Sequence, residues 1–282
     1  MLKRSMMLAT LVMVPTFDVN ADFQWQAVGA ISRNNIDLGP ADGDVDSAVL
    51  GGRYYLEEVG TSHGPLAEAV FNSQASFVGA NWVYTDADDL VDDLDSDAYT
   101  LEGRYVWQTS MPLIFEGSWM RETPDFSDID TYTLGFGAYI SPHTEVIFSY
   151  RNSDIDDSDA PEAGELGFAN SDAYGIDFQH HWELSNDGTF VLSAGYARID
   201  VEDGEDIDSW RVGSNWFVNR TLGFGVEFSR DDNSGAQQDT YSTGVNWFVT
   251  DTIGLVLAYA YSEIDNTDIE SDQILLGAEL RF

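Results

Sequence analysis

The sequence of 282 residues contains no cysteine, only seven prolines and only twelve lysine or arginine residues. The absence of cysteine excludes disulfides, thiolate metal sites and a cysteine nucleophile. Fifty acidic residues give a formal net charge of −38, which argues against a nucleic-acid partner because phosphates are bound by clustered lysine and arginine. No apolar run reaches the roughly 18 residues of a membrane-spanning helix. Aromatic residues and glycine are plentiful instead, which is typical of β-sheet proteins.

Apolar and polar residues alternate through most of the chain after residue 21, with the period of two that a half-buried β-strand requires. In residues 222–229, for example, leucine, phenylalanine and valine alternate with glycine, glutamate and serine. The alternation predicts fourteen strands, over residues 23–33, 46–57, 73–85, 97–109, 113–123, 131–140, 145–154, 172–184, 189–200, 209–219, 221–231, 240–249, 252–263 and 271–282.

A strand–turn–strand unit recurs along the chain. Segments 213–223 and 244–254 have similar sequences and begin 31 residues apart, and segment 135–145 is a weaker copy. A repeating hairpin is typical of an up-and-down barrel rather than of a solenoid. We therefore predict an all-β fold, a transmembrane up-and-down antiparallel β-barrel with 14 strands and a range of 12 to 16.

Two segments resemble a known family. The last twelve residues, 271–282, alternate and end on an aromatic residue, which resembles the C-terminal signal strand of Gram-negative outer-membrane β-barrels. Residues 54–71 include the run Gly-Pro-Leu-Ala-Glu-Ala and resemble the connection between the second and third strands in the general bacterial porin family. The resemblance implies a porin in the outer membrane, surrounded by lipid and lipopolysaccharide and inserted by the barrel-assembly machinery through the C-terminal strand. It implies no catalytic residue, and we expect neither an enzyme nor a cofactor.

The N-terminus has the pattern of a secretory signal peptide. Lys3 and Arg4 precede an apolar run, which is followed by Val19-Asn20-Ala21 as a small-residue cleavage site. We predict that residues 1–21 are removed and that residues 22–282 form a single barrel domain. The sequence leaves a monomer and a trimer equally open.

One face of the predicted strands carries most of the charged residues of the barrel wall. Placing arginine against lipid near the membrane centre costs roughly 2–4 kcal/mol, so this face must be the lumen. The predicted pore-lining residues are Arg53, Arg104, Glu116, Arg151, Asp177, Arg211, Glu227, Glu279 and Arg281. Aromatic residues near the predicted short turns indicate a periplasmic aromatic girdle. These residues are Tyr105, Trp107, Trp182, Trp216, Trp247 and Phe282.

The predicted long loops contain 36 acidic residues and no lysine or arginine. Three interpretations remain open, which are a vestibule that attracts cations, divalent ions that bridge carboxylates to each other or to lipopolysaccharide, and adaptation to a salty medium. The two densest acidic runs lack the glycine and glutamate positions of a calcium-binding loop. They therefore supply candidate metal ligands rather than a predicted site. The candidates are Asp42, Asp44, Asp46, Asp154 and Asp156.

The function that we expect is passive diffusion of small hydrophilic solutes and ions, with modest cation selectivity set by the acidic loops. The alternative is an outer-membrane receptor, adhesin or structural barrel whose acidic loops bind divalent cations. An enzyme is disfavoured because the four histidines fall near the predicted periplasmic end, whereas barrel proteases and lipases act at the outer rim. Residues 155–171 form the predicted constriction, on length alone.

Overall fold

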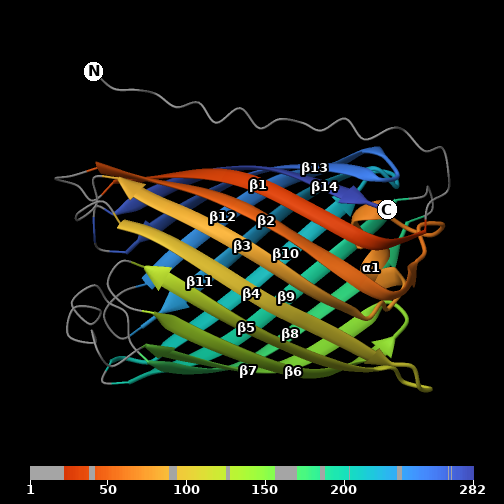
Figure 1. Ribbon diagram of the computed structural model, residues 1–282, viewed down its shortest axis with the longest axis horizontal. Coiled ribbons are helices and arrows are strands. Elements are labelled where there is room, and N and C mark those ends of the chain that lie inside the picture. The colour runs from red at the N-terminus through yellow and green to blue at the C-terminus, as the bar shows by residue number, and fades with distance from the viewer. Residues whose placement is uncertain are drawn as a thin grey trace.

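The computed structural model describes residues 22–37, 42–88, 94–124, 128–155, 170–184, 188–202, 204–233, 237–265, 267 and 269–282. The predicted signal peptide and most of the predicted constriction lie outside these residues. Fourteen strands and one short helical segment form within them (Figure 1). The strands are β1 Phe23–Asp37, β2 Asp42–Val59, β3 Phe77–Asp88, β4 Leu94–Trp107, β5 Leu113–Pro124, β6 Ile129–Ser141, β7 Thr144–Ile155, β8 Ser171–Glu183, β9 Thr189–Val201, β10 Ile207–Phe217, β11 Leu222–Asp232, β12 Gln237–Thr250, β13 Ile253–Ile264 and β14 Glu270–Arg281. None of the helices in the described ranges is long and apolar enough to cross a membrane.

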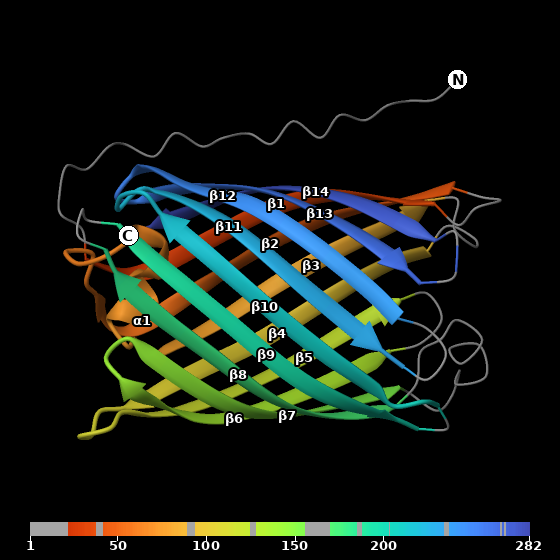
Figure 2. The same ribbon diagram turned by 180° about the vertical axis from the view of Figure 1, so that it is seen from behind.

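The strands form one closed antiparallel barrel (Figures 1 and 2). Each strand pairs with its neighbours in sequence, and β1 pairs with β14, with Gln26 opposite Arg281. Closure leaves no strand edge unpaired, which a barrel in lipid requires because lipid offers no hydrogen-bond partner. The predicted fourteen-stranded up-and-down barrel is therefore confirmed. We call the end that holds the β4–β5, β6–β7 and β12–β13 turns the short-turn end.

The strands extend further at the opposite end than the alternation predicted. β2 begins at Asp42 rather than residue 46, and β4 begins at Leu94 rather than residue 97. Backbone pairing continues there although acidic residues such as Asp44 replace the apolar ones on the outward face, so the hydropathy alternation no longer marks the strand. Several acids that were assigned to loops, including Asp44 and Asp97, therefore lie in strands.

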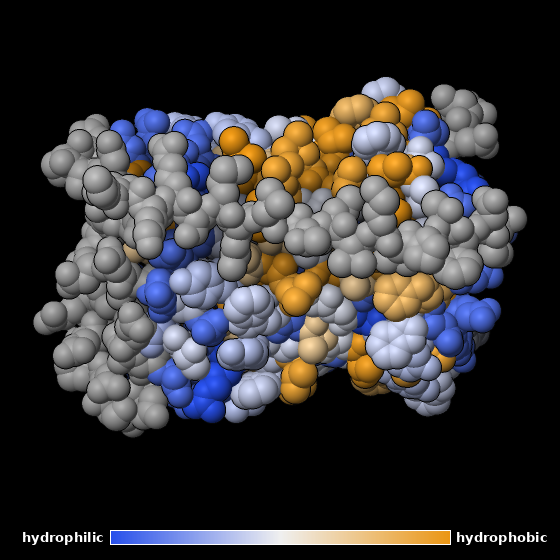
Figure 3. All heavy atoms as spheres, turned by 45° about the horizontal axis from the view of Figure 1, so that its top comes forward, coloured by the Kyte–Doolittle hydropathy of each residue, from blue (hydrophilic) through white to orange (hydrophobic). Residues whose placement is uncertain are grey.

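The outer face of the barrel carries the apolar residues. Leu134 on β6 is 66% exposed and Leu50 on β2 is 62% exposed, so neither contributes to a protein core. Figure 3 shows apolar side chains gathered in a broad band between hydrophilic rims. This arrangement is that of a barrel whose outer wall contacts lipid.

The buried core lies inside the barrel and is built by the connection between β2 and β3. The prediction that residue 73 begins a strand was wrong, because residues 60–76 form a separate inward segment, which we call the plug segment. It contains the 3-10 turn η1 (Leu66–Glu68) and the single-turn helix α1 (Ala69–Asn72), and it lies within the short-turn end (Figure 2). A cluster of buried side chains joins this segment to the wall. Its members are Phe23, Tyr55, Val59, Ala69 and Ala75.

Candidate functional site: the lumen and its plug

The lumen wall is lined by the charged face of the strands. All nine predicted pore-lining residues lie on the strand face that points into the lumen. Arg53, Arg104 and Glu116 line a cavity of about 410 Å³ beside the plug segment. Arg151, Asp177, Arg211 and Glu227 line a cavity of about 490 Å³ on another part of the wall. Glu279 and Arg281 face the plug segment from β14.

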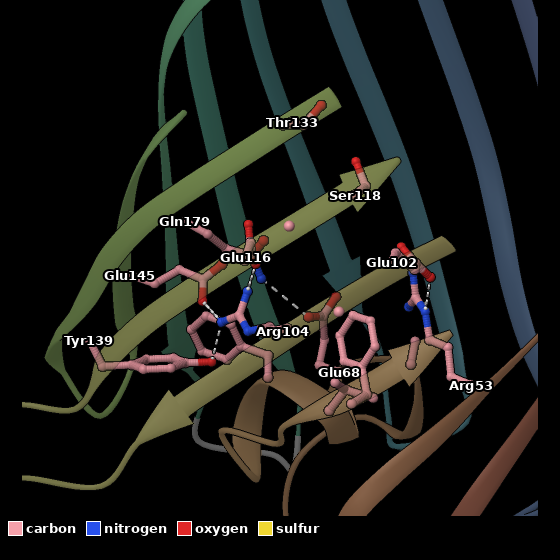
Figure 4. A pocket seen from close by; sticks show the side chains of 16 residues that line it. Arg53, Glu68, Glu102, Arg104, Glu116, Ser118, Thr133, Tyr139, Glu145 and Gln179 are labelled. Atoms are coloured by element: carbon pink, nitrogen blue, oxygen red, sulfur yellow. Dashed lines mark hydrogen bonds and ion pairs between the residues drawn. The ribbon is translucent and has the colours of Figure 1, made fainter. Parts of the chain in front are cut away.

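Arg104 is the centre of a network that joins four adjacent strands (Figure 4). It lies directly opposite Glu116 in the β4–β5 register, with 2.7 Å between Nη1 and the Glu116 carboxylate. Its Nη2 donates to Glu145 on β7 at 2.6 Å and to the Tyr139 hydroxyl on β6 at 2.8 Å. Because three oxygens surround one half-buried guanidinium, this arginine is held rigidly and its charge is neutralised locally.

Two further ion pairs span a glycine on the strand between the partners. Arg53 on β2 donates to Glu102 on β4 at 2.8 Å, and Gly79 lies between them in the register. A Cβ at Gly79 would lie 2.9 Å from the Glu102 carboxylate, so a larger residue would push the pair apart. Arg211 and Asp177 form the same arrangement, with 2.6 Å between their side chains across Gly195.

Arg151 differs from the other lumen arginines on the strands. No carboxylate lies within ion-pair distance of Arg151 in the described part of the chain, whereas Arg211 in the same cavity is paired. The lumen wall thus contains fixed charges of both signs, most of them paired, and small or hydroxyl side chains between them. Such a wall can be wetted and can contact hydrophilic solutes, but it holds no group of His, Cys, Asp or Glu placed to bind a metal ion among the described residues.

Two arginines hold one flank of the plug segment. Arg281 is 3% exposed, and its Nη1 donates to the Leu66 carbonyl at 2.8 Å. Its guanidinium also lies over the Phe23 and Phe248 rings and 2.6 Å from Glu279. The backbone carbonyl of Arg220, in the β10–β11 turn, accepts from the Leu66 amide at 2.8 Å. The Arg220 guanidinium also donates to the carbonyl of Thr61.

The other flank of the plug segment contacts β6 and β8. Phe71 stacks on the His181 ring with 3.8 Å between ring centroids and packs edge-on against Tyr139. Glu68 projects from η1 toward β8, where Gln179 donates to its carboxylate at 3.4 Å (Figure 4). Burial raises the pKa of Glu68 to about 7, and the nearby Glu145 carboxylate acts in the same direction. The plug segment therefore crosses the lumen, because its two flanks contact well-separated strands of the wall.

The alternation of the sequence did not reveal this inward segment. Residues 54–71 were identified as the connection between the second and third strands but were assigned no place in the pore. The available signal was the spacing of Leu66, Ala69 and Val70, which suits one face of a helix, just after Pro65, which is favoured where a helix starts.

The predicted girdle residues all lie on the outer face, near the short-turn end. Each is at least 42% exposed, from Trp182 to Phe282 at 65%. Of the candidate metal ligands, Asp44 and Asp46 lie beside Arg33 instead of converging on a common centre. Asp42 begins β2, Asp154 lies near the end of β7, and Asp156 lies outside the described residues.

Arginines also accompany the acids at the end opposite the short turns. Arg33, Arg121, Arg198 and Arg230 each pair with one or more aspartates there. Arg230, for example, makes two bonds to Asp239, at 2.7 and 2.8 Å. The acidic mouth of the barrel is thus partly neutralised by residues that the loop sequences alone do not include.

Comparison with known proteins places these features in context. A family model described as "Putative general bacterial porin" matches residues 33–282. A search of curated proteins found no match. Among solved structures, the outer membrane protein Omp33 of Acinetobacter baumannii is similar with a TM-score of 0.63 and 20% identity, over 94% of this chain and 100% of that one. A mutant of the monoaromatic hydrocarbon channel TodX is similar with a TM-score of 0.50 and 9% identity, over 93% of this chain and 91% of that one.

Proposed function

Because the chain belongs to the general bacterial porin family, we propose that it is a passive diffusion channel for small hydrophilic solutes and ions, with modest cation selectivity. The protein is an outer-membrane β-barrel of a Gram-negative bacterium, so its outer wall contacts lipid and lipopolysaccharide. The short-turn end is then the periplasmic end. The observation that carries the proposal is the lumen wall, where charged, hydroxyl and small side chains line two cavities instead of a packed apolar core.

Cation selectivity follows from the balance of charge. Most lumen arginines are paired with carboxylates, so the wall contributes little net potential. The acidic residues at the extracellular mouth outnumber the arginines that accompany them, so the mouth concentrates cations at low ionic strength. Screening reduces this effect when the Debye length falls to about 8 Å or less.

The expected result is a cation-selective zero-current potential under a tenfold KCl gradient at low salt, measured in a planar bilayer. Arg151→Gln should raise the cation-to-anion permeability ratio on the order of twofold, because Arg151 has no carboxylate partner among the described residues. Asp177→Asn in the same cavity is the matched opposite change and should lower this ratio, because it removes a carboxylate and leaves Arg211 unpaired on the wetted wall. An anion-selective potential in the unmodified protein would contradict the proposal.

We also propose that the protein is not an enzyme. His63 lies in the plug segment, His143 in the β6–β7 turn, and His180 and His181 near the periplasmic end of β8. No histidine in the described residues lies at the extracellular rim, where a carboxylate or serine could use it as a base toward external substrates.

A further inference from the structure

Glu68 lies where the described residues offer few hydrogen-bond donors and no unpaired cation to stabilise an ionised carboxylate. Its side chain is 16% exposed, and the polar partners of its carboxylate among the described residues are Gln179 and His181 on β8. The hydrogen bond from Gln179 is long, at 3.4 Å. Every lumen arginine near it is already bonded to another carboxylate, including Arg104. An ionised Glu68 would therefore be a buried anion with one weak donor, which is costly.

The geometry at His181 suits a protonated Glu68 instead. The Gln179 amide nitrogen lies 2.7 Å from His181 Nε2, and since an amide nitrogen can only donate, this ring nitrogen is an acceptor. Nε2 lies 3.5 Å from the Glu68 carboxylate and has no proton to offer it. The single lone pair of Nε2 is already used by Gln179. A protonated Glu68, by contrast, is neutral and needs no counter-charge, and its carbonyl oxygen can still accept from Gln179. The contact between η1 and β8 therefore costs least when Glu68 carries a proton, because no buried charge is then left without a partner.

We propose that the plug segment is a proton-controlled gate, in which protonated Glu68 holds the plug against β8 and ionised Glu68 releases it. This inference rests on the proposed channel function. Glu68 and Phe71 make the plug's contacts to β8, whereas the opposite flank is held by arginines that stay charged at any relevant pH. Release would therefore begin at β8 and leave the plug attached at Arg220 and Arg281.

The direction of the pH effect follows from linkage. The pKa of Glu68 is about 7 in the docked plug and close to its ordinary value of 4.5 once the side chain is in water. The docked plug thus binds the proton more tightly, so docking is fully favoured below about pH 4.5 and weakens as the pH rises to about 7. From about pH 5 to about pH 8 the docking constant should fall on the order of tens of fold.

Other ionisable groups face the plug segment, and the test must separate them from Glu68. Those on the surrounding strands and turns are Asp22, Arg53, Tyr55, Glu102, Arg104, Glu116, Tyr139, His143, Glu145, His181, Arg220, Glu279 and Arg281, and His63 lies on the plug segment itself. The three glutamates nearest the Arg53 and Arg104 side chains are paired with them, and His143 is exposed in its turn. His143 and the exposed His63 of the plug segment therefore need their own controls.

Single-channel conductance of the full chain in planar bilayers tests the gate. The unmodified protein should conduct several-fold more at about pH 8 than at about pH 5. Glu68→Gln keeps the shape of the protonated acid and should stay in the low-conductance state at both pH values. The control variants Glu58→Gln, at an exposed position before the plug segment, His63→Gln and His143→Gln should each retain the pH dependence. A pH response that persists in Glu68→Gln, or an unmodified protein with none, would overturn the gate.

Thiol labelling separates the gate from the channel function, because the chain has no cysteine of its own. Ile147 on β7 is 8% exposed in the buried cluster that contains Phe71, so Ile147→Cys reports undocking of this flank when a charged maleimide is added. At about pH 8 this cysteine should react faster with Glu68 present than in the Glu68→Gln background. Because both variants are labelled at the same pH, the pH dependence of thiol reactivity does not affect the comparison. Equal labelling overturns the gate. Different labelling without ion conduction would support plug movement and refute the channel.

Discussion

Replacing residues 61–72 by a short glycine-serine linker is expected to raise the single-channel conductance several-fold. These residues include both helical turns of the plug segment and cross the periplasmic end of the lumen. The two ends of the excised stretch are adjacent, since the Gly60 amide donates to the Ser73 hydroxyl at 3.0 Å, so a few residues suffice to join them. Conductance follows the narrowest cross-section of a pore, which the deletion widens.

The control for this deletion is Ser62→Ala, at an exposed position of the same segment, which should leave conductance unchanged. Barrel integrity is checked by the mobility of unboiled and boiled samples on gels. A folded deletion variant with the conductance of the parent would show that the plug segment does not limit ion flow.

The second large effect is on stability, and it concerns Arg281. Its guanidinium is buried, pairs with Glu279 at 2.6 Å, holds the Leu66 carbonyl and lies over two aromatic rings. Arg281→Met should lower the free energy of unfolding by about 3–5 kcal/mol, because it leaves a buried carboxylate without its cation. The measurement is urea unfolding in lipid vesicles, followed by tryptophan fluorescence.

Arg211→Met is the matched control for Arg281. Both arginines face the lumen and pair with one carboxylate at 2.6 Å, but the Arg211 side chain is 51% exposed. A solvent-exposed pair contributes about 1 kcal/mol or less, so this variant should unfold almost as the parent does. If both variants lost the same free energy of unfolding, burial of Arg281 at the plug segment would not explain the destabilisation.

Strand identity and wall orientation were predictable because they depend on neighbours in sequence. A period of two assigns each side chain to a face, and charge cannot face lipid, so the inward phase of Arg104, Arg151 and Arg211 follows from local pattern and solvation cost. The strand ends were less predictable, since β2 continues to Asp42 past the point where acidic residues replace the apolar ones on its outward face. Hydropathy marks the lipid layer, whereas backbone pairing extends beyond it.

The sequence by itself determined the barrel, its fourteen strands and the phase of its lumen residues. Only the tertiary structure decided what occupies the lumen. The contacts of the plug segment join residues that are far apart in the chain, such as Leu66 with Arg281 and Glu68 with Gln179, at separations of 215 and 111 residues. Closure of the barrel brings these partners together. The sequence of a short helical turn does not indicate which distant residues it will contact. Barrel closure also places Glu68 near Arg104, whose guanidinium is already paired with Glu116 and Glu145. The raised pKa of Glu68 therefore arises from the assembled wall.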